Sequence, residues 1–167
     1  MSKQTINILA GASLGLLAVV LCAPALWAEP PVSEVILESD SWPAPSGFWE
    51  GPAIIWVDGV KYSGQIYYSA EGKMNQNSWH GTELKVYDFG VLGTLEVSGS
   101  ARTVFAYVSP EHRWHRYSSN VRITGGTGAF AMATGTFKFV GYTDWDLTGA
   151  QPPHAFEGTH SKIVGIQ

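Results

Sequence analysis

Short apolar or alternating runs, separated by turn residues, make up most of this chain. From residue 47 onward no segment keeps a helical period over several turns. Alternate residues of a strand share one face, so an alternating run predicts a strand with one buried face. Eight strands are predicted on this basis: Pro52–Val57, Val60–Ser69, Trp79–Tyr87, Leu92–Ser98, Ala101–Val108, Trp114–Thr124, Phe130–Gly141 and Ala155–Val164.

Most connections between these runs are short, and two have the chemistry of a tight turn. Asp58-Gly59 and Gly99-Ser100 each lie between strand-like runs, and a primed hairpin turn needs positive φ angles of the kind that Gly and Asp adopt. The longest connection between the later strands is Tyr142–His154. The fold class predicted is all-β, an eight-stranded antiparallel up-and-down barrel, because closure removes exposed strand edges.

Two segments precede the predicted barrel domain of residues 47–167. Residues 1–28 combine a basic start at Lys3, an apolar run and small-x-small cleavage sequences, which predicts a signal peptide and export to the periplasm or the cell exterior. The apolar run is shorter than the roughly 20 residues of a membrane-spanning helix, so no stable membrane anchor is expected. Residues 29–46 are acidic and rich in proline, which predicts an irregular arm or linker.

The cysteine content and the net charge limit which kinds of chemistry and which partners are expected. Cys22 is the single cysteine and lies in the predicted leader, so the exported part would have neither a disulfide nor a thiol. Leu21 is larger than the residue that normally precedes a lipidated cysteine, which disfavours a lipoprotein. The net charge is −4. Such a chain lacks the basic surface that holds a phosphate backbone, so nucleic acid is not an expected partner.

A glycine-rich hairpin sequence gives the chain a family resemblance. Its residues 121–137, VRITGGTGAFAMATGTF, contain a run that resembles the Gly-Gly-Thr-Gly-x-Phe-x-x-Ala-x-Gly hairpin of the allene oxide cyclase and dirigent barrels. The first glycines of the run supply the backbone freedom of a compact turn. Phe130 is expected to plug the end of the barrel, and Gly135 to permit a bulge where the strand curves.

The resemblance implies a barrel that holds a small hydrophobic molecule, phenolic or unsaturated, in its cavity. Members of these families steer a cyclisation or a radical coupling mainly by templating a conformation. They need no metal or nucleotide, so no cofactor is implied, and some are trimers, so a homo-oligomer (dimer or trimer) is a possible state. No catalytic residue is carried over, because the matching residues lie in the hairpin. A carrier without chemistry and a purely structural barrel remain as alternatives.

Titratable side chains gather in the loops at one predicted end of the barrel. Alternate loops share an end, which groups Asp58, Asp88, Glu111, His112, Asp144, Asp146 and His154. An imidazole with an orienting carboxylate suits general acid–base catalysis, so the candidate catalytic residues are His112, His115, Asp144 and His154. The alternative is that these are ordinary polar loop residues that do no more than stay solvated. No metal is predicted, because the spacing of His112 and His115 places them on opposite faces of a strand.

Aromatic residues on the strands are the candidates for the cavity wall. Alternation and aromatic character select Trp56, Tyr62, Tyr68, Phe105, Tyr107, Trp114, Phe137 and Phe139 as ligand-binding residues. A barrel packed solid with such side chains is the alternative. The run Thr103–Val108 is apolar on both faces. It therefore predicts a second buried surface, either a subunit interface or a surface covered by the arm.

Overall fold

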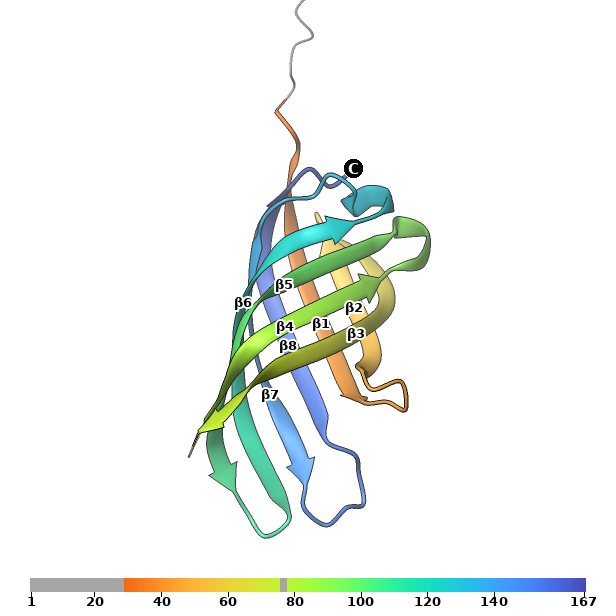
Figure 1. Cartoon of the computed structure of the whole chain (residues 1–167). Helices are drawn as coiled ribbons and strands as arrows, with labels where there is room; N and C mark the ends of the chain where they lie inside the picture. Colours follow the sequence, from red (N-terminus) through yellow and green to blue (C-terminus); the bar gives the residue numbers. More distant parts are fainter. Residues whose placement is uncertain (1–28, 76–77) are drawn as a thin grey trace, which may run out of the picture.

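The computed structural model describes residues 29–75 and 78–167, which form a closed barrel of eight antiparallel strands (Figure 1). The strands are β1 (Val32–Pro43), β2 (Trp49–Val57), β3 (Val60–Asn75), β4 (Ser78–Asp88), β5 (Thr94–Val108), β6 (His112–Gly126), β7 (Thr136–Asp146) and β8 (His154–Val164). Each strand pairs with the next along the chain, and β1 pairs with β8 to close the barrel. The predicted fold class is confirmed, and the predicted signal peptide lies outside the described residues.

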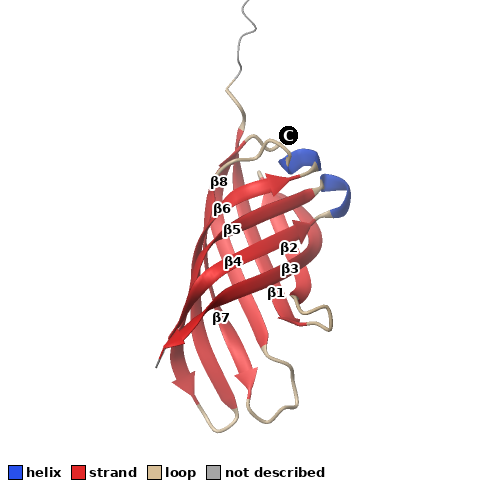
Figure 2. Ribbon diagram, in the orientation of Figure 1, coloured by secondary structure: helices blue, strands red, loops and turns tan. Residues whose placement is uncertain are grey.

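The two ends of the barrel are built differently. At one end, which we call the closed end, the short 3-10 helices η1 (Gly90–Leu92) and η2 (Gly128–Phe130) fold over the strands (Figure 2). Phe130 is 1% exposed, and its ring lies 5.9 Å from that of Phe89. The prediction that Phe130 plugs the barrel is therefore confirmed. At the opposite end, which we call the open end, residues 44–48, 109–111 and 147–153 form loops.

The Pro-rich segment forms a strand, which corrects the prediction of an irregular arm over residues 29–46. Its prolines bracket β1: Pro30 and Pro31 precede the strand, and Pro43 is its last residue. Between them no proline interrupts the ladder, and the side chains alternate, with Val35 and Leu37 fully buried. Because β1 pairs with β2 and β8, it does not cover Thr103–Val108. The side chains of residues 105–108, on which the predicted second buried surface depends, lie outside what the structure describes.

The predicted turn at Gly99-Ser100 is wrong, since both residues lie inside β5. Glycine is required there because two strands approach closely. A Cβ atom on Gly99 would lie 2.1 Å from the carbonyl oxygen of Asn120 on β6. A glycine inside a strand pattern can mark such an approach instead of a turn. By contrast, the turn at Asp58-Gly59 is confirmed, with φ angles of 49° and 83°.

The false turn also explains an error in the predicted grouping of loops. One extra reversal of the chain exchanges the ends to which all later loops belong. Asp58 and Asp88 adjoin the turns of the closed end, whereas His112, Asp144 and His154 lie near the open end. The predicted start of the seventh strand at Phe130 is corrected as well, because η2 occupies that position and β7 begins at Thr136.

We expect Gly99→Ala to lower the free energy of unfolding by about 1–3 kcal/mol, because the new methyl group would displace the backbone of β6. Gly158→Ala on β8 is a matched control, since its Cβ would lie 3.5 Å from the nearest atom, Cγ of Glu38, which is an ordinary contact. Urea unfolding of both variants measures the difference. Equal stabilities of the two variants would contradict the close approach at Gly99.

The interior is layered along the barrel axis. Apolar side chains fill the half nearest the closed end and include Val35, Leu37, Ile55, Leu95, Val97, Phe130, Phe137 and Ile163. Buried charged residues follow in the middle: Glu83, Lys85 and Glu157. Beyond this polar layer, toward the open end, the barrel contains a cavity. The packed half therefore acts as a base on which the polar layer and the cavity are built.

Candidate functional site

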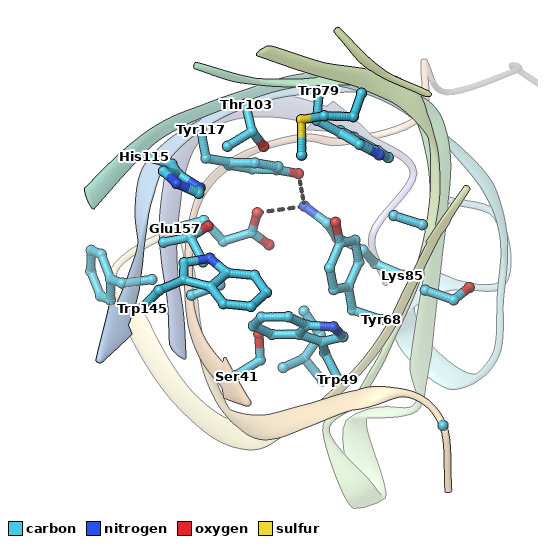
Figure 3. Close-up of a pocket in the computed structure, with 18 residues that line it drawn as sticks. Ser41, Trp49, Tyr68, Trp79, Lys85, Thr103, His115, Tyr117, Trp145 and Glu157 are labelled. Carbon is cyan, nitrogen blue, oxygen red and sulfur yellow. Dashed lines mark hydrogen bonds and ion pairs between the residues drawn. The ribbon is translucent and has the colours of Figure 1, made fainter. Parts of the chain in front are cut away.

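A cavity of about 330 Å³ lies inside the barrel at its open end (Figure 3). Its lining includes Trp49 from β2, Tyr68 from β3, Trp79 from β4 and Trp145 from β7. The volume lies at the lower end of the range typical of small-molecule sites. The interior is therefore not packed solid, and the space is wide enough for a molecule of one or two rings.

Aromatic contacts hold the wall of the cavity in place. The ring of Trp49 meets the rings of Tyr68 and Trp145 edge to face, with centroids 6.3 and 6.5 Å apart. Edge-to-face packing of this kind contributes beyond simple burial and restrains each ring. Trp145 remains 40% exposed. It therefore lies at the rim, where a guest would pass it on entering.

The floor of the cavity is a buried ion cluster centred on Lys85. The Lys85 Nζ atom lies 2.5 Å from Oε2 of Glu157 and 3.1 Å from Oε1 of Glu83. It also donates a hydrogen bond of 2.9 Å to the Tyr117 hydroxyl. The side chains of Lys85 and Glu83 are 1% and 0% exposed. The buried ammonium group thus makes two hydrogen bonds and has a second carboxylate at ion-pair distance, whose Oε1 accepts no hydrogen bond from the described residues.

Hydroxyl groups complete the cluster on its other sides. The Tyr117 hydroxyl donates to Oε2 of Glu83. Oε1 of Glu157 accepts hydrogen bonds from the Tyr87 hydroxyl at 3.0 Å and from Ser39 Oγ at 3.1 Å. Four different strands, β1, β4, β6 and β8, supply these groups. The cluster therefore ties together parts of the barrel that are distant in the sequence.

Aromatic rings also surround the Lys85 ammonium. Its Nζ atom lies 4.2 Å from the ring centroid of Phe139, 5.0 Å from that of Tyr117 and 5.5 Å from that of Tyr68. The face of an aromatic ring carries partial negative charge and attracts a cation at these distances. The charge of Lys85 is therefore stabilised by ring faces as well as by carboxylates.

The tyrosines of the site remain protonated at neutral pH. Burial raises the pKa of Tyr68, Tyr87 and Tyr117, and the negative charges of Glu83 and Glu157 raise the same pKa values further. Tyr68 lines the cavity. Its neutral hydroxyl can donate a hydrogen bond to a guest or accept one from it.

Of the predicted catalytic residues, His115 lines the cavity. Burial, followed by the positive charge of Arg113, lowers the pKa of His115 below its usual 6.5. Its imidazole is therefore neutral at neutral pH. The ring of Trp145 lies 6.2 Å from it and shields it toward the rim. His115 therefore lies on the cavity wall, and its catalytic role stays a prediction.

The other predicted catalytic residues lie on the outer face of the barrel. His112 and His115 are three residues apart on β6, so their side chains lie on opposite faces of the strand. His115 faces the interior, and His112 therefore faces outward. His112 Nδ1 lies 3.1 Å from Oδ1 of Asp144, and His154 Nε2 lies 3.1 Å from Oδ1 of Asp40. His112, Asp144 and His154 line a separate hollow outside the wall. The structure brings these residues together, but not at the cavity.

The predicted ligand-binding residues divide in a similar way. Tyr68 lines the cavity, whereas Phe137 and Phe139 belong to the packed core beneath it and Tyr62 packs against that core. Trp56 and Trp114 face outward, where Trp56 contacts Lys61 and Trp114 contacts Tyr142. The side chains of Phe105 and Tyr107 lie outside what the structure describes.

The sequence pattern does not predict a cluster of Glu83, Lys85 and Glu157, because charged residues are not expected inside a barrel. In β4 the usual pattern is inverted, with Glu83 and Lys85 buried and Leu84 43% exposed. A signal was present in the sequence. Glu83 and Lys85 share the strand face of Trp79 and Tyr87, so a single side of the strand carries two charges between two aromatic rings.

We expect His112→Ala to leave the cavity's affinity for a guest unchanged and to alter the free energy of unfolding by less than about 1 kcal/mol. The reason is that the His112–Asp144 pair is partly exposed and lies outside the wall. Titration of the variant with a fluorescent guest, together with urea unfolding, measures both quantities. A tenfold loss of affinity would show that the outer hollow belongs to the site.

Comparisons of the chain with protein-family models, with curated proteins and with solved structures gave no match. Within residues 29–75 and 78–167, no group of three His, Cys, Asp or Glu side chains is placed to hold a metal ion. The helices in that same part of the chain are too short for any of them to cross a bilayer. What is established is an eight-stranded antiparallel barrel with an aromatic cavity over a buried ion cluster.

Proposed function

We propose that this protein is an exported barrel that binds one small hydrophobic molecule, phenolic or unsaturated, in the cavity at its open end. The observation that carries the proposal is the cavity of about 330 Å³ with its aromatic wall. This function agrees with the resemblance of the Gly125–Gly135 hairpin to the allene oxide cyclase and dirigent barrels. Membership of that family is part of the proposal.

The aromatic wall of the cavity offers apolar contact area to a ligand, and its polar groups can orient that ligand. Trp49, Trp79 and Trp145 offer flat apolar surface, which favours burial of a ring or a conjugated chain. Tyr68 and Glu157 offer polar atoms to the cavity. A pocket with apolar walls and a few convergent polar groups fixes the orientation of its ligand.

The chemistry that fits this site best is a cofactor-free cyclisation, isomerisation or coupling. A wall that holds one conformation of a flexible guest can lower a barrier by several kcal/mol without a strong nucleophile. His115 and Glu157 both reach the cavity, and an imidazole and a carboxylate can take up or return a proton. A carrier would use the same cavity without turnover.

Titration with a neutral apolar dye, N-phenyl-1-naphthylamine, tests the proposed binding. We expect saturable quenching of tryptophan fluorescence with one dye per barrel. Trp145→Ala should weaken the affinity about tenfold, because truncating a large aromatic anchor typically costs more than 1 kcal/mol. Trp114→Ala on the outer face is the matched control and should bind as the unmodified protein does. Absence of a saturable phase in the unmodified protein would overturn the proposal.

A second measurement separates the enzyme from the carrier. His115→Ala should retain the dye affinity within a few-fold, because the dye needs only the aromatic wall. If the protein converts a phenolic or polyunsaturated substrate, the same variant should lose turnover. Turnover that persists unchanged in His115→Ala would remove this residue from the mechanism. Dye binding without turnover of any such substrate would favour the carrier.

A further inference from the structure

The ion cluster at the cavity floor is unbalanced in charge. Two carboxylates, on Glu83 and Glu157, face the single ammonium group of Lys85. The neighbouring tyrosine hydroxyls are neutral and contribute no charge. The cluster therefore carries a formal excess of one negative charge, although its members are almost completely buried. An uncompensated charge is costly in a buried site, so a compensating positive charge would be favoured there.

The cluster has unused capacity to accept hydrogen bonds. Lys85 donates hydrogen bonds to Glu157 and Tyr117, and its Nζ atom lies 3.1 Å from Oε1 of Glu83, an atom that accepts no hydrogen bond from the described residues. The Tyr117 hydroxyl proton is directed to Glu83. Glu157 lines the cavity, and its Oε2 accepts one hydrogen bond from Lys85. A carboxylate oxygen can accept two, so the floor offers a guest an acceptor and a negative charge.

The walls above this floor suit the same kind of guest. Trp49, Trp79 and Trp145 surround the space above Glu157, as Figure 3 shows. Ring faces attract an organic cation, and tryptophan does so most strongly. This protein already contains one cation in such surroundings, because three aromatic rings and two carboxylates lie around the ammonium group of Lys85. Among the described residues that line the cavity, Lys85 and Glu157 carry the formal charges.

We infer that the guest of this cavity is an organic cation, an aromatic or unsaturated body that carries an ammonium group directed toward Glu157. The inference rests on the proposed binding function and specifies the ligand's charge. An anionic guest would be repelled by the excess negative charge of the floor. A neutral guest would leave that charge uncompensated.

Two ligands of the same shape test the inference. The 3-hydroxyphenyltrimethylammonium ion and 3-tert-butylphenol differ by the exchange of a charged nitrogen for a carbon. Each is titrated into the complete protein against bound N-phenyl-1-naphthylamine at neutral pH. We expect the cation to bind at least about tenfold more tightly than the neutral phenol, which corresponds to about 1.4 kcal/mol.

Two conservative substitutions assign the preference to the cluster. Glu157→Gln and Glu83→Gln each leave one carboxylate opposite Lys85, so each removes the excess charge while keeping a side chain of the same shape. Both should bring the ratio of the two affinities close to one. Glu83 does not line the cavity, so its effect would report charge alone. Thr143→Ser, a lining change without a change of charge, should retain the full ratio.

Each outcome decides between the inference and the proposed function. Equal affinities, or tighter binding of the phenol, would overturn the cation inference and leave a binding barrel for neutral guests. Displacement of the dye by neither ligand would also overturn the inference. Failure of the dye itself to bind would overturn the proposed function. A preference for the cation that survives in both glutamine variants would show that the cluster is not its source.

Discussion

Replacement of Lys85 by methionine should lower the free energy of unfolding by about 3–5 kcal/mol. The substitution removes the cation from the buried cluster and leaves Glu83 and Glu157 facing each other without compensation. Breaking a buried ion pair from one side costs far more than the pair contributes when it is whole. Urea unfolding, followed by tryptophan fluorescence, measures the loss.

Two controls separate the loss of the charge from the loss of the side chain. Lys61→Met on the outer face, where Lys61 lies over the Trp56 ring, should change stability by no more than about 0.5 kcal/mol. Combining Lys85→Met with Glu83→Gln and Glu157→Gln should recover most of the lost stability, because no buried charge remains. A loss below about 1 kcal/mol for Lys85→Met alone would contradict the buried cluster.

The second large effect concerns alkaline pH. The pKa values of Tyr68, Tyr87 and Tyr117 are raised by burial and by the two glutamates. Above about pH 10 these tyrosines ionise in the unfolded chain but keep their protons in the folded protein. The folded state then binds more protons than the unfolded state. Stability is therefore complete below about pH 10 and falls as the pH rises above it, by up to about 1.4 kcal/mol per pH unit for each tyrosine.

Absorbance titration and urea unfolding at a series of alkaline pH values check this expectation. Of the seven tyrosines in the sequence, these three should not ionise until the protein unfolds. Tyr68→Phe should make the fall in stability with pH shallower by the contribution of one proton. Tyr67→Phe, which replaces a side chain that is 40% exposed, is the matched control for removal of a tyrosine hydroxyl. Ionisation of all seven near the ordinary pKa in the folded protein would contradict the buried polar layer.

The strand number and the fold class could be predicted because hydrophobic alternation and the Asp58-Gly59 turn are local signals. Two errors in the prediction compensated each other. The strand β1 was missed because its flanking prolines indicate an irregular arm, although they lie at the ends of the strand and leave its interior free to pair, and β5 was divided at Gly99. Close approach of two strands and a turn both select glycine, so a single sequence does not distinguish them.

The site was less predictable than the fold for a related reason. Which face of a strand turns inward depends on the pairing register of all the strands in the barrel. A shift of that register by one residue exchanges the inward and outward faces of the strand. His112 and His115 were both assigned to the site, although their spacing allows just one of them to face the cavity. The ion cluster joins Glu83 and Lys85 to Glu157 across more than 70 positions, which no local pattern encodes.

Nuclear magnetic resonance of the tryptophan indole N–H groups tests the central claim most directly. The cavity is lined by Trp49, Trp79 and Trp145, whereas Trp56 and Trp114 lie on the outer face and Trp42 lines the outer hollow. During titration with the 3-hydroxyphenyltrimethylammonium ion, we expect the three cavity signals to shift together and to saturate. The other three should remain in place. Saturating shifts confined to the outer tryptophans would contradict a binding site inside the barrel.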